Sequence, residues 1–119
     1  MLSAEQRLKN LECPQGRIDM VLDTDSYNEI DDQFAISYAL RAKEKLNVKA
    51  LYAAPFFNAR SASPADGMEL SYREIMKLLR LAGVEKPVFR GSDRYLPDEH
   101  PLFLQTLRGT SVHALWTIQ

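Results

Sequence analysis

The chain has 119 residues, of which 45% are hydrophobic and 26% are charged, and its formal net charge is −1. This length is typical of one domain, and the charge excludes the strong positive field of a nucleic-acid-binding surface. No apolar run approaches the roughly 18 residues of a membrane span, and the N-terminal segment is too polar for a signal peptide. The single cysteine, Cys13, has no internal disulfide partner, which is typical of a reducing compartment. We therefore expect a cytoplasmic protein that binds neither nucleic acid nor membrane.

The first half of the chain predicts a helix, a strand and a second helix. Residues 3–11 are expected to form a short amphipathic helix capped by Ser3, and residues 1–16 are interpreted as an N-terminal helix or arm. Residues 17–22 predict a strand, and residues 31–43 predict a helix with Asp31 and Asp32 in its first turn, where the helix dipole favours anions. Its apolar stripe is expected to comprise Phe34, Ala35, Ile36, Tyr38, Ala39 and Leu40.

The second half continues the alternation. Residues 48–56 predict a strand that is apolar enough to be buried on both faces. The following helix is predicted to start with Ser63 as N-cap and Pro64 at its first position, with Asp66 completing a capping box, and to stop at Gly83. Asp66 with Glu69 offers a competing start three residues later. Residues 86–90 predict a third, short strand.

Strands that alternate with helices predict an α/β fold: an open, mainly parallel sheet with flanking helices, similar in layout to a Rossmann fold. In such sheets ligands bind beyond the carboxyl ends of the strands. An acidic segment follows the first strand, Asn58 follows the second, and Asp93 and Arg94 follow the third. We expect these three polar groups to converge at one edge of the sheet.

The acidic segment, VLDTDSYNEIDDQF, is the most unusual part of the sequence. Its five carboxylates, Asp23, Asp25, Glu29, Asp31 and Asp32, repel one another unless a positive charge lies among them. Hard cations such as Ca²⁺ and Mg²⁺ take carboxylate ligands, so a metal site is predicted. A capped helix with a solvated acidic loop is the simpler alternative. An EF-hand loop is excluded, because its glycine position would fall on Asn28 and its glutamate position on Phe34.

The opening VLDTDS resembles the start of haloacid-dehalogenase-type phosphatases. That resemblance implies Asp23 as the nucleophile of a Mg²⁺-dependent phosphatase. Such enzymes do not need the acidic pair Asp31-Asp32 at the start of the next helix. The phosphatase therefore stays an alternative.

A second resemblance covers more of the chain. Asp23-Thr24-Asp25 followed by Asp31-Asp32 resembles the D-x-D-x-x-x-D-D signature of inosine–uridine-preferring nucleoside hydrolases. ALYAAPFFN is similar to the family's second strand, SYREIMKLLRLAG to its second helix, and KPVFRGSDRYL to the region of its third strand. The resemblance extends over roughly residues 17–101, which we interpret as an incomplete nucleoside hydrolase-like α/β domain.

This resemblance implies Ca²⁺-dependent hydrolysis of the N-glycosidic bond of ribonucleosides, as in purine and pyrimidine salvage. By position, Asp25 and Asp32 would be calcium ligands, and Asp25 would also take a proton from the attacking water. Asp31 and Asn58 would bind the ribose. Asp23 would help to orient the metal ligands without binding the metal itself.

Two departures from the family pattern affect these expectations. The turn between Asp25 and Asp31 is two residues longer than the signature, so Glu29 is expected to add a ligand or to reshape the pocket. Base and sugar preference therefore stay open. Chains of the family are also much longer, and their remaining calcium ligands and leaving-group histidine come from later segments.

Residues 102–119 form a tail that does not resemble the family's continuation, and His100 and His113 are interpreted as surface or packing residues. We therefore expect weak or absent turnover, and a non-enzymatic metal-binding fragment is a further alternative. The apolar residues of the tail have two open roles: covering the sheet or driving association into a homo-oligomer.

Overall fold

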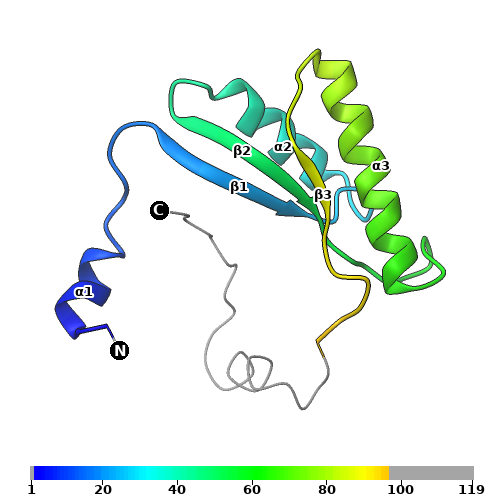
Figure 1. The fold of residues 1–119 in the computed structure, drawn as a ribbon, viewed down its shortest axis with the longest axis horizontal. Coiled ribbons are helices and arrows are strands. Elements are labelled where there is room, and N and C mark those ends of the chain that lie inside the picture. Colours follow the sequence, from blue (N-terminus) through cyan, green and yellow to red (C-terminus); the bar gives the residue numbers. More distant parts are fainter. Residues whose placement is uncertain (1, 97–119) are drawn as a thin grey trace.

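The computed structural model describes residues 2–96, which contain three helices and three strands in the order expected of an α/β fold (Figure 1). The predictions for the tail, including His100 and His113, lie outside these residues. The strands form a parallel sheet in the order β1-β2-β3, which confirms the predicted fold class. The elements are α1 (Ala4–Lys9), β1 (Ile18–Thr24), α2 (Asp31–Arg41), β2 (Leu46–Ala53), α3 (Pro64–Ala82) and β3 (Val88–Arg90).

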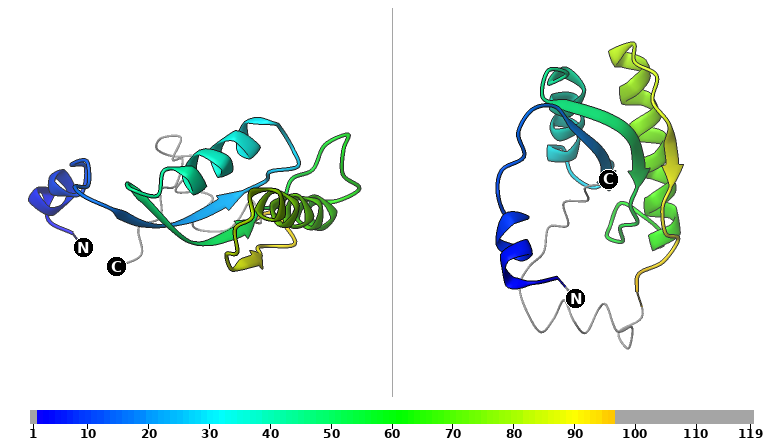
Figure 2. Two further views of the ribbon diagram at one scale, coloured as in Figure 1. Left: turned by 90° about the horizontal axis from the view of Figure 1, so that it is seen from above. Right: turned by 60° about the vertical axis from the view of Figure 1, so that its left-hand side comes forward.

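The helix α1 lies apart from the sheet (Figures 1 and 2). The hydroxyl of Ser3 accepts the N–H of Gln6, and the side chain of Gln6 accepts the N–H of Ser3, both at 3.1 Å. This reciprocal cap explains why so short a helix forms. None of its residues is buried, so α1 contributes nothing to the core.

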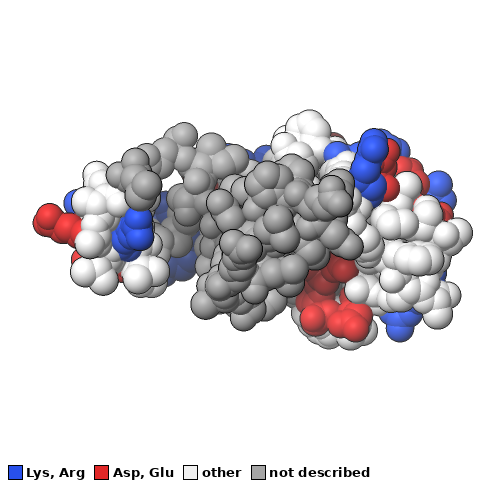
Figure 3. Space-filling model, turned by 90° about the horizontal axis from the view of Figure 1, so that it is seen from below, with Lys and Arg blue, Asp and Glu red and all other residues white. Residues whose placement is uncertain are grey.

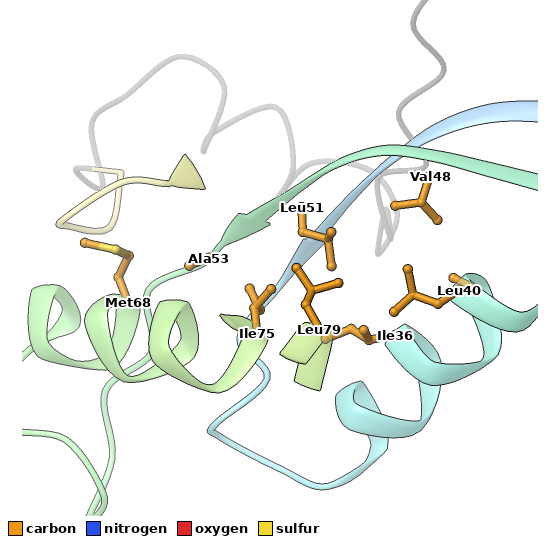
Figure 4. Packing of buried hydrophobic residues seen from close by; sticks show 9 residues of the cluster. Ile36, Leu40, Val48, Leu51, Ala53, Met68, Ile75 and Leu79 are labelled. Atoms are coloured by element: carbon orange, nitrogen blue, oxygen red, sulfur yellow. The ribbon is translucent and has the colours of Figure 1, made fainter. Parts of the chain in front are cut away.

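Both long helices cover the same face of the sheet (Figures 2 and 4). The core lies between that face and the helices, and its largest fully buried side chains are Ile36, Leu51 and Ile75. The opposite face carries no helix from the described residues, and there the rings of Tyr52 and Phe89 stack at 5.0 Å. Tyr52 is 37% exposed. The prediction that the second strand is buried on both faces is therefore wrong for the described part of the chain.

The predicted apolar stripe of α2 is partly wrong. Phe34 and Tyr38 are 69% and 72% exposed, whereas Ile36, Ala39 and Leu40 are buried. The buried residues follow the spacing of one helical face, and a rotation of about 100° per residue turns Phe34 and Tyr38 away from the sheet. The i, i+4 spacing of Phe34 and Tyr38 is that of an apolar line, but the line of Ile36 and Leu40 is the one that packs on the sheet.

The start of α3 fixes the loop that follows β2. Ser63 caps the helix by accepting the N–H of Asp66 at 3.1 Å, as predicted, but the Asp66 carboxylate accepts the N–H of Ala62 rather than completing the capping box. Gly67 lies against the carbonyl of Phe56 so closely that a Cβ would come within 2.0 Å of the carbonyl oxygen. At the other end, Gly83 closes the helix in the left-handed conformation, with φ of 62°.

The three strands reach the same edge of the sheet at their carboxyl ends. β1 continues beyond the predicted end and includes Asp23 and Thr24, while β2 ends at Ala53. Pairing continues just past the strands, because the N–H of Ala54 donates to the carbonyl of Thr24 and the N–H of Gly91 donates to that of Ala53. Within residues 2–96 no helix is both long and apolar enough to cross a membrane.

Candidate functional site

The acidic turn, residues 23–32, connects the end of β1 to the start of α2. Thr24, the last residue of β1, is buried, and its hydroxyl donates to Oδ1 of Asp32 at 2.5 Å. The fully buried Ser26 donates to the carbonyl of Ser71 in α3 at 3.3 Å. These two contacts anchor the turn on both sides of Asp25.

Two carboxylates of the turn, those of Asp25 and Asp32, come together as expected. The pKa of Asp32 is raised above its ordinary value, chiefly because partial burial disfavours its charged form. The hydrogen bond from the Thr24 hydroxyl lowers the pKa of Asp32 and so opposes this rise. The Asp25 carboxylate, which lies within hydrogen-bonding reach, raises the pKa further, and so does the charge of Asp31. The carboxylates of Asp25 and Asp32 are therefore neighbours, and the charge of Asp31 acts on Asp32 as well.

The negative charge of the turn has little compensation. Within residues 2–96, no lysine or arginine forms an ion pair with any acid of this turn; the ion pairs there involve the acids Asp19, Glu69, Glu74 and Asp93. On the face seen in Figure 3, one cluster of acidic side chains lies next to uncharged surface, whereas other acidic side chains lie among lysines and arginines. The amino end of α2 supplies a partial positive charge to Asp31 and Asp32. A bound cation would relieve the repulsion that remains.

The loop after β2 joins the acidic turn through side-chain amides. Nδ2 of Asn28 donates to Oδ2 of Asp25 at 2.9 Å, and Nδ2 of Asn58 donates to Oδ1 of Asn28 at 2.6 Å. Arg60 adds a contact from its guanidinium to the carbonyl of Asn28. The convergence of Asn58 with the turn is confirmed. Sequence reasoning missed Asn28 and Arg60, because their contacts join two loops that lie far apart in the sequence.

Other predicted site residues do not join this network. Glu29 is exposed, and no hydrogen bond or ion pair of its side chain occurs within the described residues. Asp93 and Arg94 pair with each other at 2.9 Å and lie in the exposed segment after β3. The expected convergence of all three strand ends thus holds for the first two only.

Asp23 lies within β1, in register with Tyr52, and is exposed. Desolvation of its carboxyl raises the pKa of Asp23, the N–H of Thr24 opposes the rise, and the charge of Asp25 adds to it. Because the residue as a whole is exposed, solvent screens this effect. Asp23 contributes charge close to Asp25.

The donor set of the turn fits a hard cation in chemical type, because Asp25 and Asp32 offer carboxylate oxygens. Among the described residues, no group of three or more His, Cys, Asp or Glu side chains is arranged to hold a metal ion. Ca²⁺ takes roughly six to eight oxygen ligands. The described residues would therefore supply two side-chain ligands, with water, backbone or substrate oxygens completing the shell.

No protein-family model, curated protein or solved structure matches the chain significantly. The fold and site by themselves define an α/β protein with an acidic turn at the carboxyl edge of a parallel sheet. Any more particular function therefore depends on the chemistry of this edge.

Proposed function

We propose that the chain is a nucleoside hydrolase-like cytoplasmic protein whose acidic turn binds Ca²⁺ for hydrolysis of the N-glycosidic bond of ribonucleosides. The observation that carries the proposal is the meeting of Asp25 with Asp32 at the carboxyl edge, with Asn58 joined to Asp25 through Asn28. This grouping is what the resemblance to nucleoside hydrolases requires of these residues.

In this proposal Asp25 and Asp32 hold the cation, and Asp25 also accepts a proton from the attacking water at its carboxylate. When bound, the cation orients the ribose hydroxyls and makes its water more acidic. Asp31, which is exposed at the first position of α2, accepts a hydrogen bond from a ribose hydroxyl. Asn58 holds the sugar from the facing loop. Cleavage of the bond develops positive charge on the sugar, which the carboxylates of the turn stabilise. The base leaves with the bonding electron pair and takes up a proton from solvent, while the oxygen of the deprotonated water bonds to the sugar carbon.

The test is release of free base from inosine and uridine by the full chain, with Ca²⁺ and with a chelator. We expect slow, Ca²⁺-dependent release, because the described residues supply only part of a calcium shell. Asp25→Asn should abolish it. Asp19→Asn is the matched control, since Asp19 lies near the opposite end of β1 and pairs with Lys49.

Two results would replace this proposal. Intact nucleosides after long incubation with saturating Ca²⁺ would favour a metal-binding protein without turnover. Phosphate release that needs Mg²⁺ and is lost in Asp23→Asn would favour the phosphatase alternative.

A further inference from the structure

The side chain of Asn28 has a defined orientation. Its Nδ2 group donates to the Asp25 carboxylate, and its Oδ1 accepts from Asn58. The reverse orientation would place an amide oxygen against a carboxylate and an NH₂ group against the Asn58 NH₂ group, so both contacts would become repulsive. Asp25 and Asn58 therefore allow only one orientation of the Asn28 amide group.

The Asn58 side chain is oriented in turn by its own loop. Its Oδ1 accepts the backbone N–H of Arg60 at 2.9 Å, and its backbone N–H donates to the hydroxyl of Ser61 at 3.3 Å. The result is a run of three hydrogen bonds, from Arg60 to Asn58 to Asn28 to Asp25, in which every donor points toward the carboxylate. Hydrogen bonds aligned in this way polarise and strengthen one another.

Asn28 is also held through its backbone. Its N–H donates to the carbonyl of Asp25 at 2.7 Å, and its carbonyl accepts from the Arg60 guanidinium. The residue is half-buried, unlike its exposed neighbours Tyr27 and Glu29. It lies in the part of the turn that exceeds the nucleoside hydrolase signature in length. Asn28 thus connects this part of the turn to the second loop.

We propose that Asn28 is a positioning residue that fixes the Asp25 carboxylate and ties it to Asn58. The hydrogen bonds of Asn28 then position both the cation ligand Asp25 and the sugar-binding Asn58. A movement of the Asp25 side chain would therefore also displace Asn58. This inference rests on the proposed function, because it assigns Asp25 to a cation and Asn58 to a sugar.

The test uses Asn28→Ala in the full chain and two independent readouts. The first is NMR without any cation, following the carboxyl ¹³C signal of Asp25 and the side-chain NH₂ signals of Asn58. The second is the affinity for Tb³⁺, a luminescent substitute for Ca²⁺. Asn47→Ala is the matched control, because Nδ2 of Asn47 donates to Oδ1 of Asp19 in the same kind of Asn–Asp contact, in the strand region away from the turn.

Asn28→Ala should shift the signals of both Asp25 and Asn58 and weaken Tb³⁺ binding about tenfold, the lower end of the usual effect of losing a partner of a metal ligand. Asn47→Ala should change neither. Unshifted Asn58 signals would overturn the connection, and unchanged Tb³⁺ affinity would overturn the positioning role. A wild-type chain that binds no Tb³⁺ while the NMR shifts occur would instead refute the cation site and leave Asn28 as a purely structural link.

Discussion

The hydroxyl of Thr24 donates a 2.5 Å hydrogen bond to the carboxylate of Asp32. Thr24 ends β1 and Asp32 lies in the first turn of α2, so this bond closes the acidic turn at its base. It holds Asp32 against Asp25 although the two charges repel. A contact between consecutive elements therefore helps to hold the two carboxylates close together.

Thr24→Val keeps the shape of the side chain and removes this donor. We expect a loss of about 1–2 kcal/mol in the free energy of unfolding, because the partly buried Asp32 carboxylate loses a hydrogen bond. The pKa of Asp32 should rise further, since the Thr24 hydroxyl lowers it in the wild type. Chemical denaturation and NMR titration measure the two effects. Thr24→Ser, which retains the hydroxyl, should change both far less; equal losses in the two variants would contradict the role of the bond.

Asp32 should make the folded state less stable as the pH rises, which is the opposite of the usual effect of a carboxyl group. Its folded pKa is raised above the ordinary value of 3.8, so the folded state binds the proton more tightly than the unfolded state does. The stability that this proton provides is complete below the unfolded pKa and is lost as the pH rises through the folded pKa. At neutral pH the ionised group is destabilising.

Asp32→Asn should therefore raise the free energy of unfolding at pH 7 without divalent cations, because it removes a charge that the folded state disfavours. The gain should shrink as the pH falls toward 3.8. Asp19→Asn provides the contrast, because the pKa of Asp19 is lowered by Asn47 and Lys49. That variant should lose stability at neutral pH. Denaturation curves over a pH series would contradict the account if both variants changed in the same direction.

Gly67→Ala tests how α3 positions the Asn58 loop. The new methyl group would meet the carbonyl of Phe56 at 2.0 Å, so helix and loop must move apart. We expect a loss of about 1–3 kcal/mol, the usual cost of overpacking, together with shifted NMR signals of Asn58. Gly83→Asn is the control, since Asn tolerates the left-handed backbone at the end of α3. An unperturbed Asn58 in Gly67→Ala would show that this close approach does not position the loop.

Much of the fold could be predicted from local signals. The Ser63 cap, the Gly83 stop and the alternation of strand and helix patterns are encoded within a few residues, and the structure confirms them. The exposure of Phe34 and Tyr38 could not be predicted in this way. Two apolar lines run along α2, and only the packing of the helix on the sheet decides which of them is buried.

The candidate site could likewise be predicted only in part. Asp25, Asp32 and Asn58 were predicted to converge because parallel strands bring their carboxyl ends to one edge. Asn28 could not be singled out, because its role depends on a side chain 30 residues away. The extra length of the turn predicts that Glu29 adds a ligand or reshapes the pocket, and the structure shows that Glu29 is exposed.

The central claim is that the acidic turn binds Ca²⁺ through Asp25 and Asp32, and a calorimetric Ca²⁺ titration of the full chain tests it most directly. The account predicts one binding event in the wild type and in Asp19→Asn, and its loss in both Asp25→Asn and Asp32→Asn. The absence of binding by the wild type, or equal affinity in Asp25→Asn, would contradict it.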